Sequence, residues 1–359
     1  MTANRIVSPP YEGCYPLIDT HTHFDDPVFL PDRIVQMAQA QSVGVRHLLL
    51  IGYVRQYFSR LYDVQAEINS KGTAKVAVAD LRNNTQDSCL QYTQYDFQYD
   101  PQHDLQSQPQ DRLQAHIALG LHPFYIESHD EDDLQYLATT LSQRSDIIAI
   151  GEIGLDTYTA QMKQPSVYEK QKRYFISQLD MAVAHGLPVL LHIRKAHADC
   201  LKILKNHAYD AHKLGGIAHS FSGGEQEAKA FVKLGFKLGV TGQVTNPNAK
   251  KLRRAISAAV DSYGLSCLVI ETDCPDMLPL IDQSDEQSRS TNENVLSNES
   301  DGANSLNTVA HPQRNTPAHL TYVLATLSEL LAVPLDTLAQ QLWQNSCEAL
   351  KVAWHYPLD

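Results

Sequence analysis

The chain has 359 residues, of which 29 are basic and 41 acidic, so its formal net charge is −12 at pH 7. That sign is wrong for a protein that coats nucleic acid non-specifically, although bound cations can reverse the potential inside one cleft. The six cysteines form no C-x-x-C pair, and no apolar run is long enough for a signal peptide or membrane span, so we expect reduced thiols, a cytoplasmic location and no membrane partner.

Eight short runs rich in Val, Ile and Leu follow one another along the chain, each bounded by polar or glycine residues. This composition is typical of parallel strands that are buried on both faces. The predicted strands are 17–19, 45–51, 115–119, 147–150, 188–191, 216–218, 236–240 and 267–270.

Amphipathic segments of helical length lie between these runs. The clearest are 31–41, 168–185, 197–206, 225–234 and 250–259, and two more helices are predicted at 317–332 and 334–352. Strands that alternate with helices predict a parallel α/β sheet, and eight such units predict closure into a TIM (β/α)8 barrel. We therefore expect a single barrel domain over residues 1–359.

Two polar segments interrupt the alternation. Residues 71–112 are rich in Gln, Asp and Tyr, and residues 282–308 are polar and acidic with almost no apolar side chains. Neither can bury enough apolar surface to offset the entropy lost on ordering. We interpret both as insertions into barrel loops and expect the second to be disordered.

The first strand ends in the motif Asp19-Thr20-His21-Thr22-His23. Residues two apart on a strand face the same side, so both imidazoles are expected to point at the barrel axis. Two imidazoles on one face form half of a metal site, although this motif alone also fits a surface or core pair.

Four more residues with metal-ligand side chains end later strands. Glu152, His192, His219 and Asp273 follow the fourth, fifth, sixth and eighth apolar runs. The carboxyl ends of the strands form the rim where TIM barrels place their active sites. Four imidazoles and two carboxylates are too many ligands for one tetrahedral ion and suit two. Six unrelated core residues would bury two unpaired carboxylates at a cost in free energy, so we expect a two-metal site.

Motifs along the whole barrel resemble those of the TatD-type metal-dependent hydrolases, a branch of the amidohydrolase-like barrels with DNase members. They are IDTHTHFDDPVF, ALGLHP, AIGEIGLD, LPVLLHIRKAH, GIAHSFSGG, LGVTGQVT, LVIETDCPDMLP and QRNTP, in order from Ile18 to Pro317. In this resemblance Glu152 takes the place of the bridging carboxylated lysine of many relatives. The resemblance also implies that the metal ligands are the six residues that the strand ends select: His21, His23, Glu152, His192, His219 and Asp273.

Three positions depart from the family pattern. Phe124 stands where the family often has a second histidine, Ser220 replaces the usual cysteine after the sixth-strand histidine, and Thr316 replaces the glutamate of an RNEP-like motif. These changes fall at the rim where substrate binds and spare the metal ligands. They therefore bear on which substrate is cleaved more than on whether the chemistry is hydrolysis.

Three residues are candidates for binding the substrate. Arg194 lies two residues past His192 and is expected to point into the mouth, where it holds a phosphate bidentately or pairs with a loop carboxylate. Arg314 resembles the family's phosphate-contacting arginine. His122 is either a donor behind the ligands, a proton shuttle or a hydrogen-bonded core histidine.

Three further features have alternative interpretations. Glu271 lies two residues before Asp273, and residues two apart on a strand face the same side. It is therefore expected to point inward and orient a ligand histidine. The loop 222–224 before a helix either presents amides to an anion or is a plain turn. The basic run 250–254 is interpreted as a solvated helix face.

The pattern as a whole predicts hydrolysis of a phosphodiester, most simply in DNA, by water activated with two divalent cations. Glu152 and Asp273 are the expected catalytic residues, Asp273 as the base. Zn, Mn, Co and Ni suit the imidazoles, while Mg suits the carboxylates and a phosphate. Two alternatives are open: hydrolysis of a small amide, lactone or other ester, and a non-catalytic metal-dependent adaptor. No protein partner is expected.

Overall fold

The structure is a computed structural model that describes residues 11, 13–71, 112–280 and 314–357. The predicted insertion at 71–112 lies outside these residues except at its two ends, and the one at 282–308 lies wholly outside them.

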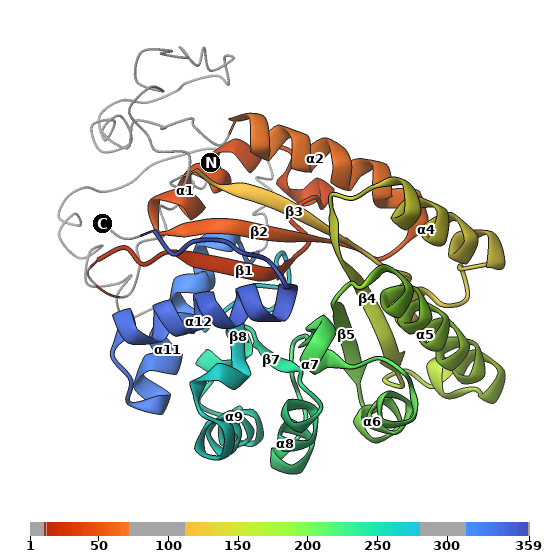
Figure 1. Cartoon of the computed structure of the whole chain (residues 1–359). Coiled ribbons are helices and arrows are strands. Elements are labelled where there is room, and N and C mark those ends of the chain that lie inside the picture. The colour runs from red at the N-terminus through yellow and green to blue at the C-terminus, as the bar shows by residue number, and fades with distance from the viewer. Residues whose placement is uncertain (1–10, 12, 72–111, 281–313, 358–359) are drawn as a thin grey trace, which may run out of the picture.

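Eight parallel strands lie side by side in chain order, each hydrogen-bonded to the next (Figure 1). Backbone bonds also join the first strand to the last: Asp273 N donates to His21 O and His23 N donates to Cys274 O, both at 2.9 Å. The predicted TIM barrel is therefore confirmed. The strands are β1 (Leu17–Thr22), β2 (Val45–Gly52), β3 (Gln114–Leu119), β4 (Ile147–Asp156), β5 (Val189–Arg194), β6 (Ile217–Ala218), β7 (Lys237–Val240) and β8 (Leu268–Ile270).

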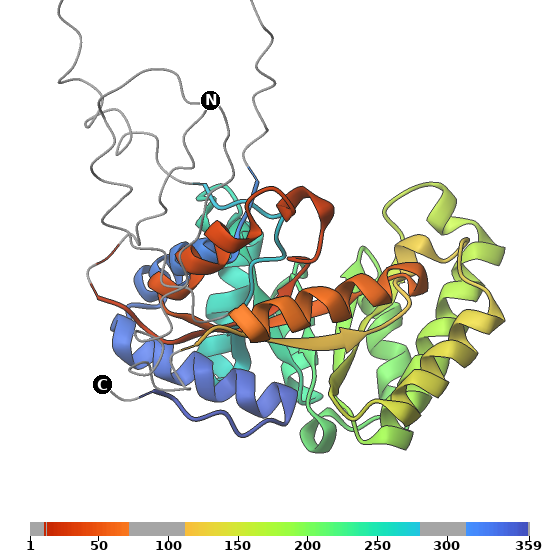
Figure 2. The same ribbon diagram turned by 90° about the horizontal axis from the view of Figure 1, so that it is seen from above.

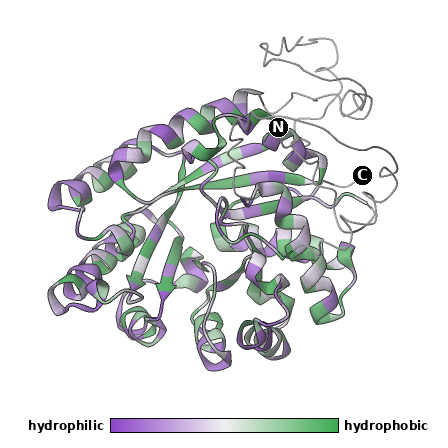
Figure 3. Cartoon of the chain, turned by 180° about the vertical axis from the view of Figure 1, so that it is seen from behind, coloured by the Kyte–Doolittle hydropathy of each residue, from purple (hydrophilic) through white to green (hydrophobic). Residues whose placement is uncertain are grey.

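Helices surround the strands on the outside of the barrel (Figures 1 and 2). They show both hydrophilic and hydrophobic colours in Figure 3, as expected for segments that bury one face and expose the other. The main helices are α1 (Arg33–Ser42), α2 (Phe58–Lys71), α4 (Glu131–Gln143), α5 (Pro165–His185), α6 (His197–Asn206), α7 (Ala211–Leu214), α8 (Glu225–Lys233), α9 (Lys250–Tyr263), α11 (Leu320–Leu331) and α12 (Leu335–Leu350).

The interior of the barrel is packed with side chains and is not a pore. One buried apolar cluster joins inward-facing residues of several strands with residues near the end of the chain, and Trp354 packs against it. This packing closes the end of the barrel opposite the candidate site. The cluster contains Leu49, Ile51, Ala118, Ala149, Leu190, Ile217, Val269, Ala349 and Leu350.

The sequence patterns missed three helices and three strand ends. Helices α2, α4 and α7 were not predicted. β1, β4 and β5 run on to Thr22, Asp156 and Arg194, beyond their predicted ends at 19, 150 and 191. Glu152 and His192 therefore lie within their strands, where the ladder continues with Gly154 opposite His192 and Asp156 opposite Arg194.

Within the described residues, no single helix is both long enough and apolar enough to cross a membrane. Two consecutive helical segments, Pro317–Leu331 and Leu335–Leu350, together have the length and apolar composition of a membrane span, but the chain bends by 113° between them.

Candidate metal centre

All six candidate ligands come together at the carboxyl ends of the strands. β1 supplies His21, and His23 follows it directly. Glu152 and His192 project from β4 and β5, while His219 and Asp273 stand in the loops just after β6 and β8. Four of the six are buried, while the side chains of His23 and His192 keep 19 % and 18 % exposure, which leaves the centre open beside these two histidines.

Glu152 lies at the middle of the cluster, with its two oxygens facing different histidines. Oε2 is 3.4 Å from His21 Nε2 and 4.0 Å from His23 Nε2. Oε1 is 2.7 Å from His192 Nδ1 and 3.7 Å from His219 Nε2. The two oxygens thus face two different pairs of imidazoles, which also meet directly, because the rings of His21 and His219 are stacked with centroids 3.3 Å apart.

Asp273 makes a second connection between these groups. Its Oδ1 is 3.7 Å from His21 Nε2 and 3.8 Å from His23 Nε2, and its Oδ2 is 3.5 Å from His219 Nε2. The residue has a left-handed backbone, with φ of 56°, and its amide is fixed by the bond to His21 O. This conformation turns the side chain back over the end of β1.

The spacing of these atoms fits a divalent cation. Two ligands that are each about 2.1 Å from an ion at a tetrahedral angle are about 3.4 Å apart. The contacts of His21 and His23 with the carboxylates, at 3.4 to 4.0 Å, are close to that value and are long for hydrogen bonds. Among the described residues, both ring nitrogens of His21 and Nδ1 of His23 are buried without a hydrogen-bond partner. Buried polar atoms normally have one, and a bound cation would supply it for Nε2 of His21.

The imidazoles keep both carboxylates ionised. Burial raises the pKa of Glu152, but His122, His219, His21 and His192 outweigh it and hold that pKa well below its usual value. Burial also raises the pKa of Asp273, but the neighbouring His219, His21 and His23 lower it by more, so its pKa lies below the usual value. Anionic carboxylates are the form that binds a metal.

Two further carboxylates stand behind the ligand histidines. Glu271 Oε1 is 3.0 Å from His219 Nδ1, and Asp156 Oδ2 is 2.9 Å from His192 Nε2. The contact of Asp156 is a hydrogen bond, which fixes the tautomer and orientation of a ligand imidazole, while Glu271 contacts His219 without hydrogen-bond geometry. Glu271 is predicted from its spacing of two residues to Asp273, whereas the sequence pattern did not select Asp156. The signal was available, because Asp156 shares the face of Glu152 on one strand.

Asp19 is a third buried carboxylate that the sequence analysis did not assign. It accepts hydrogen bonds from Thr272 N at 2.9 Å and from Thr272 Oγ1 at 2.5 Å, so it joins β1 to the segment after β8. Burial raises its pKa to about 7. Its place two residues before His21 makes it a support for the centre.

Of the three candidates for substrate binding, only His122 lies against the ligands. Its Nε2 is 3.3 Å from Glu152 Oε1 and 3.1 Å from His192 Nδ1, and its Nδ1 accepts a bond from Phe124 N. Arg194 is exposed, with its guanidinium carbon 3.6 Å from the centre of the Tyr158 ring.

The third candidate, Arg314, has other partners. Its guanidinium forms an ion pair with Asp32 and lies 4.6 Å over the Phe29 ring.

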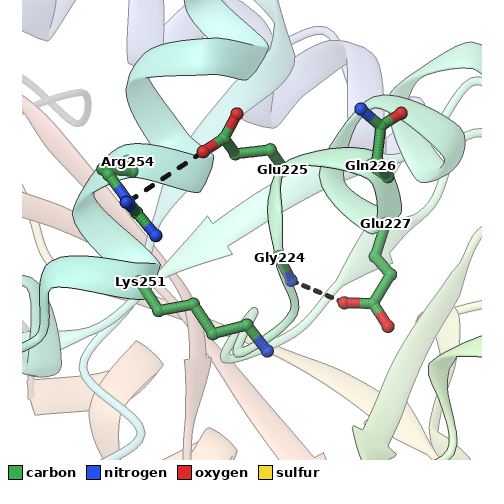
Figure 4. Close-up of a pocket in the computed structure, with 6 residues that line it drawn as sticks. All are labelled: Gly224, Glu225, Gln226, Glu227, Lys251 and Arg254. Carbon is green, nitrogen blue, oxygen red and sulfur yellow. Dashed lines mark hydrogen bonds and ion pairs between the residues drawn. The ribbon is translucent and has the colours of Figure 1, made fainter.

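The turn at 222–224 and the basic run at 250–254 meet around a hollow of about 430 Å³ (Figure 4). Gly224 N donates to Glu227 Oε2 at 2.5 Å, so its amide caps its own helix. Arg254 Nε is 3.9 Å from Glu225 Oε1. The turn is therefore a capped helix start, and Arg254 of the basic run faces Glu225 in the first turn of that helix.

Comparison with known proteins gives one family over nearly the whole chain. Residues 18–351 match the family model described as TatD related DNase. The chain is 31 % identical over 330 residues to YjjV of Escherichia coli K12, an uncharacterized metal-dependent hydrolase, covering 92 % of this chain and 95 % of that protein. The crystal structure of YjjV superposes with a TM-score of 0.65 at 29 % identity, covering 94 % and 98 % of the two chains.

A shorter match is to the 3′-5′ ssDNA/RNA exonuclease TatD of Cronobacter turicensis. The two are 34 % identical over 161 residues, which cover 45 % of this chain and 57 % of that protein. The crystal structure of a TatD family hydrolase from Entamoeba histolytica, at 18 % identity and a TM-score of 0.63, shares the fold.

Proposed function

Because the chain belongs to the TatD-related DNase family, as its motifs predict, we propose that it hydrolyses phosphodiester bonds in DNA with two divalent cations. The observation that carries the proposal is the position of Glu152, one of whose oxygens faces His21 and His23 and the other His192 and His219. A carboxylate between two ligand groups is the arrangement that a bridged pair of cations requires.

The two proposed sites share the central carboxylates. His21 and His23, with Glu152 and Asp273, would hold one cation. His192 and His219, with Glu152, would hold the other. His122 borders this second group, at 3.3 Å from Glu152 Oε1, and we assign it to hydrogen bonding with the substrate.

Bound divalent cations lower the pKa of water to near neutrality and neutralise charge on phosphate oxygens. Asp273 has one oxygen toward His21 and His23 and the other toward His219, so it lies where a proton would leave the attacking water, and we assign it as the base. Glu271 and Asp156 hold their histidines in place during this step.

Phosphates outside the reacting position need separate contacts. Arg194 is exposed beside the fifth strand and can exchange its contact with the Tyr158 ring for a phosphate. Arg314 is paired with Asp32, so it contacts substrate only by exchanging that carboxylate for a phosphate. We place the reaction in the cytoplasm, since the five cysteines that the structure describes are free.

The test is a metal-reconstituted substrate panel. Protein stripped with EDTA is supplied separately with Zn, Mn, Mg, Co or Ni and given labelled single-stranded and duplex DNA, RNA, and a set of small amides, lactones and neutral esters. We expect metal-dependent cleavage of DNA and, by elemental analysis, up to two ions per chain. Turnover of the small esters or amides without any cleavage of nucleic acid would contradict the proposal.

A further inference from the structure

Four aromatic side chains form a continuous group at the carboxyl ends of β2 and β3. Tyr53 follows β2, Tyr57 ends the short helix η2 (Arg55–Tyr57), and Phe124 and Tyr125 belong to η4 (Pro123–Tyr125). The ring centroids of Tyr53 lie 5.6 Å from Tyr57 and 5.4 Å from Tyr125, and Phe124 lies 5.4 Å from Tyr125. We refer to these four residues as the aromatic platform.

The aromatic platform borders the metal centre directly. The Tyr53 ring packs edge-on against the proposed ligand His23, with centroids 5.2 Å apart. The Tyr125 ring packs against His122 at 5.8 Å, and His122 in turn contacts Glu152. A group held by the platform therefore lies beside a phosphate that is held at the centre.

Polar contacts fix the platform in place. His122 N donates to Tyr53 O at 3.0 Å, which ties the two loops together. The Arg60 guanidinium donates to the buried Asp25 at 2.8 Å, reaches the Tyr53 hydroxyl at 3.5 Å and lies 4.7 Å over the Tyr57 ring. The rings are thus preorganised by bonds that do not involve their outer faces.

The outer rings remain open to solvent. Phe124 is 40 % exposed and Tyr125 41 % exposed. Exposed aromatic surface next to a reactive centre is typical of a binding site, and every nucleobase has a flat face that stacks on such a ring. The faces of a base inside a duplex are covered by its neighbours, so only an unpaired base can use the platform.

We propose that the aromatic platform is a stacking subsite for an unpaired nucleobase adjacent to the scissile phosphate. This inference rests on the proposed function and specifies the substrate as a single-stranded segment. Recognition then has two parts: the cations and Arg194 would bind the phosphates, and the rings of Tyr125 and Phe124 would stack on the base.

The experiment compares two single strands with identical phosphates. One carries all its bases, and the other has abasic residues at the cleaved end, so only stacking differs. We expect wild-type protein to have a lower KM for the strand with bases. Tyr125→Ala should reduce that preference roughly 5- to 150-fold, the range that one base–aromatic stack contributes. Tyr125→Phe keeps the ring and should keep the preference.

Tyr263→Ala is the matched control. Tyr263 is 40 % exposed, like Tyr125, but it ends α9 at the opposite end of the barrel. It should retain the wild-type preference. Equal KM values of the wild type for the two strands, or loss of the preference in Tyr263→Ala as well, would overturn the subsite.

A binding measurement separates this inference from the proposed function. An oligonucleotide with 2-aminopurine at its end is titrated with protein in EDTA, so that nothing is cleaved. Stacking should quench the 2-aminopurine fluorescence with wild type, and much less with Phe124→Ala plus Tyr125→Ala. Quenching without cleavage under any metal would refute the proposed function and support the subsite, while cleavage without quenching or base preference would refute the subsite alone.

Discussion

The proposed ligands His192 and His219 both face Glu152, and each also contacts a second carboxylate through its other ring nitrogen. Asp156 contacts His192, and Glu271 contacts His219. Strand-end position alone was sufficient to select six ligand-type residues from the sequence, because convergence at the rim follows from barrel geometry. Asp156 was not selected, because the fourth strand was predicted to end at 150, with Glu152 as the residue at its rim. Continuing the strand by two repeats of the pleat would have placed Asp156 on the same face.

Asp156→Asn should weaken metal binding without removing a ligand. The amide keeps the size of the side chain but loses the negative charge beside His192 Nε2. Loss of such a partner typically costs 10- to 100-fold in metal affinity. Chelator competition measures this dissociation constant, and Glu271→Gln should behave similarly. An affinity within twofold of wild type would show that Asp156 does not support the ligand.

The double variant His21→Ala plus His23→Ala should lose metal. Both imidazoles lie near Glu152 Oε2 and Asp273 Oδ1, so their removal leaves one group with carboxylates alone. Elemental analysis after dialysis should show at least one ion fewer per chain than wild type. Wild-type metal content would mean that the centre lies elsewhere.

Asp273→Asn should abolish most turnover while the barrel stays folded. The substitution keeps the shape and one coordinating oxygen but removes the charge and the proton acceptor. Loss of a base typically costs 10²- to 10⁴-fold in kcat. The rate is measured on single-stranded DNA with excess metal, and circular dichroism monitors the fold. Near-wild-type turnover would exclude Asp273 as the base.

At the scale of strands and helices, the sequence indicated every strand but misplaced several ends. The continuous apolar run of β4 stops at 150 because glycine and site carboxylates alternate with Ile153 and Leu155 beyond it, although the hydrogen-bond ladder continues. The missed helix α4 has leucines at 134, 137 and 141, and Asp130 with Asp133 forms its capping box. These signals are present in the sequence. The four residues of α7 are too few to show a period.

At the opposite end of β2 and β3, the buried His47 and the partly buried His116 pack against Trp354 near the end of the chain. His47 Nδ1 and His116 Nε2 are 3.1 Å apart, and both rings stack on Trp354, with centroids at 4.0 and 4.3 Å. Burial lowers the pKa of His47 to about 3, helped by His116 and Arg46, and burial lowers that of His116 to about 4. Both imidazoles are therefore neutral in the folded protein at pH 7.

Stability should fall as the pH drops from about 6.5 toward 4. Below pH 6.5 these histidines become protonated in the unfolded protein but stay neutral in the folded protein. The free energy of unfolding therefore decreases as the pH falls from about 6.5 toward the folded pKa values. Thermal melts in EDTA, followed by fluorescence, report on this region directly, because Trp343 and Trp354 are the only two tryptophans. His116→Leu should flatten the pH dependence. An unchanged slope would exclude these histidines as a cause.

At the scale of the whole molecule, the centre lies across the seam where the barrel closes. Backbone bonds from Asp273 and Cys274 to β1 join the first strand to the last, and both sides of the seam supply proposed ligands. The barrel and its rim could be predicted from alternating strands and helices. The details of the seam could not, because they depend on contacts between residues some 250 positions apart, such as Thr20 with Ile270.

Removing metal should therefore lower the melting temperature of the whole barrel. A cation present at 100 times its dissociation constant stabilises the folded state by about 2.7 kcal/mol, which corresponds to a shift of roughly 5 °C. Scanning calorimetry with and without EDTA measures this shift. The double variant His21→Ala plus His23→Ala is the control and should respond much less. An equal response in both would mean that EDTA acts away from this centre.

The same seam determines when the protein can first become active during its synthesis. A ribosome-bound chain exposes His21 and His23 early, but Asp273 and its bonds to β1 come only with the last strand. Until that strand has left the ribosome, the nascent chain lacks the proposed base and one side of the proposed metal site. The proposed centre therefore assembles late in synthesis, only after residue 273 has left the ribosome.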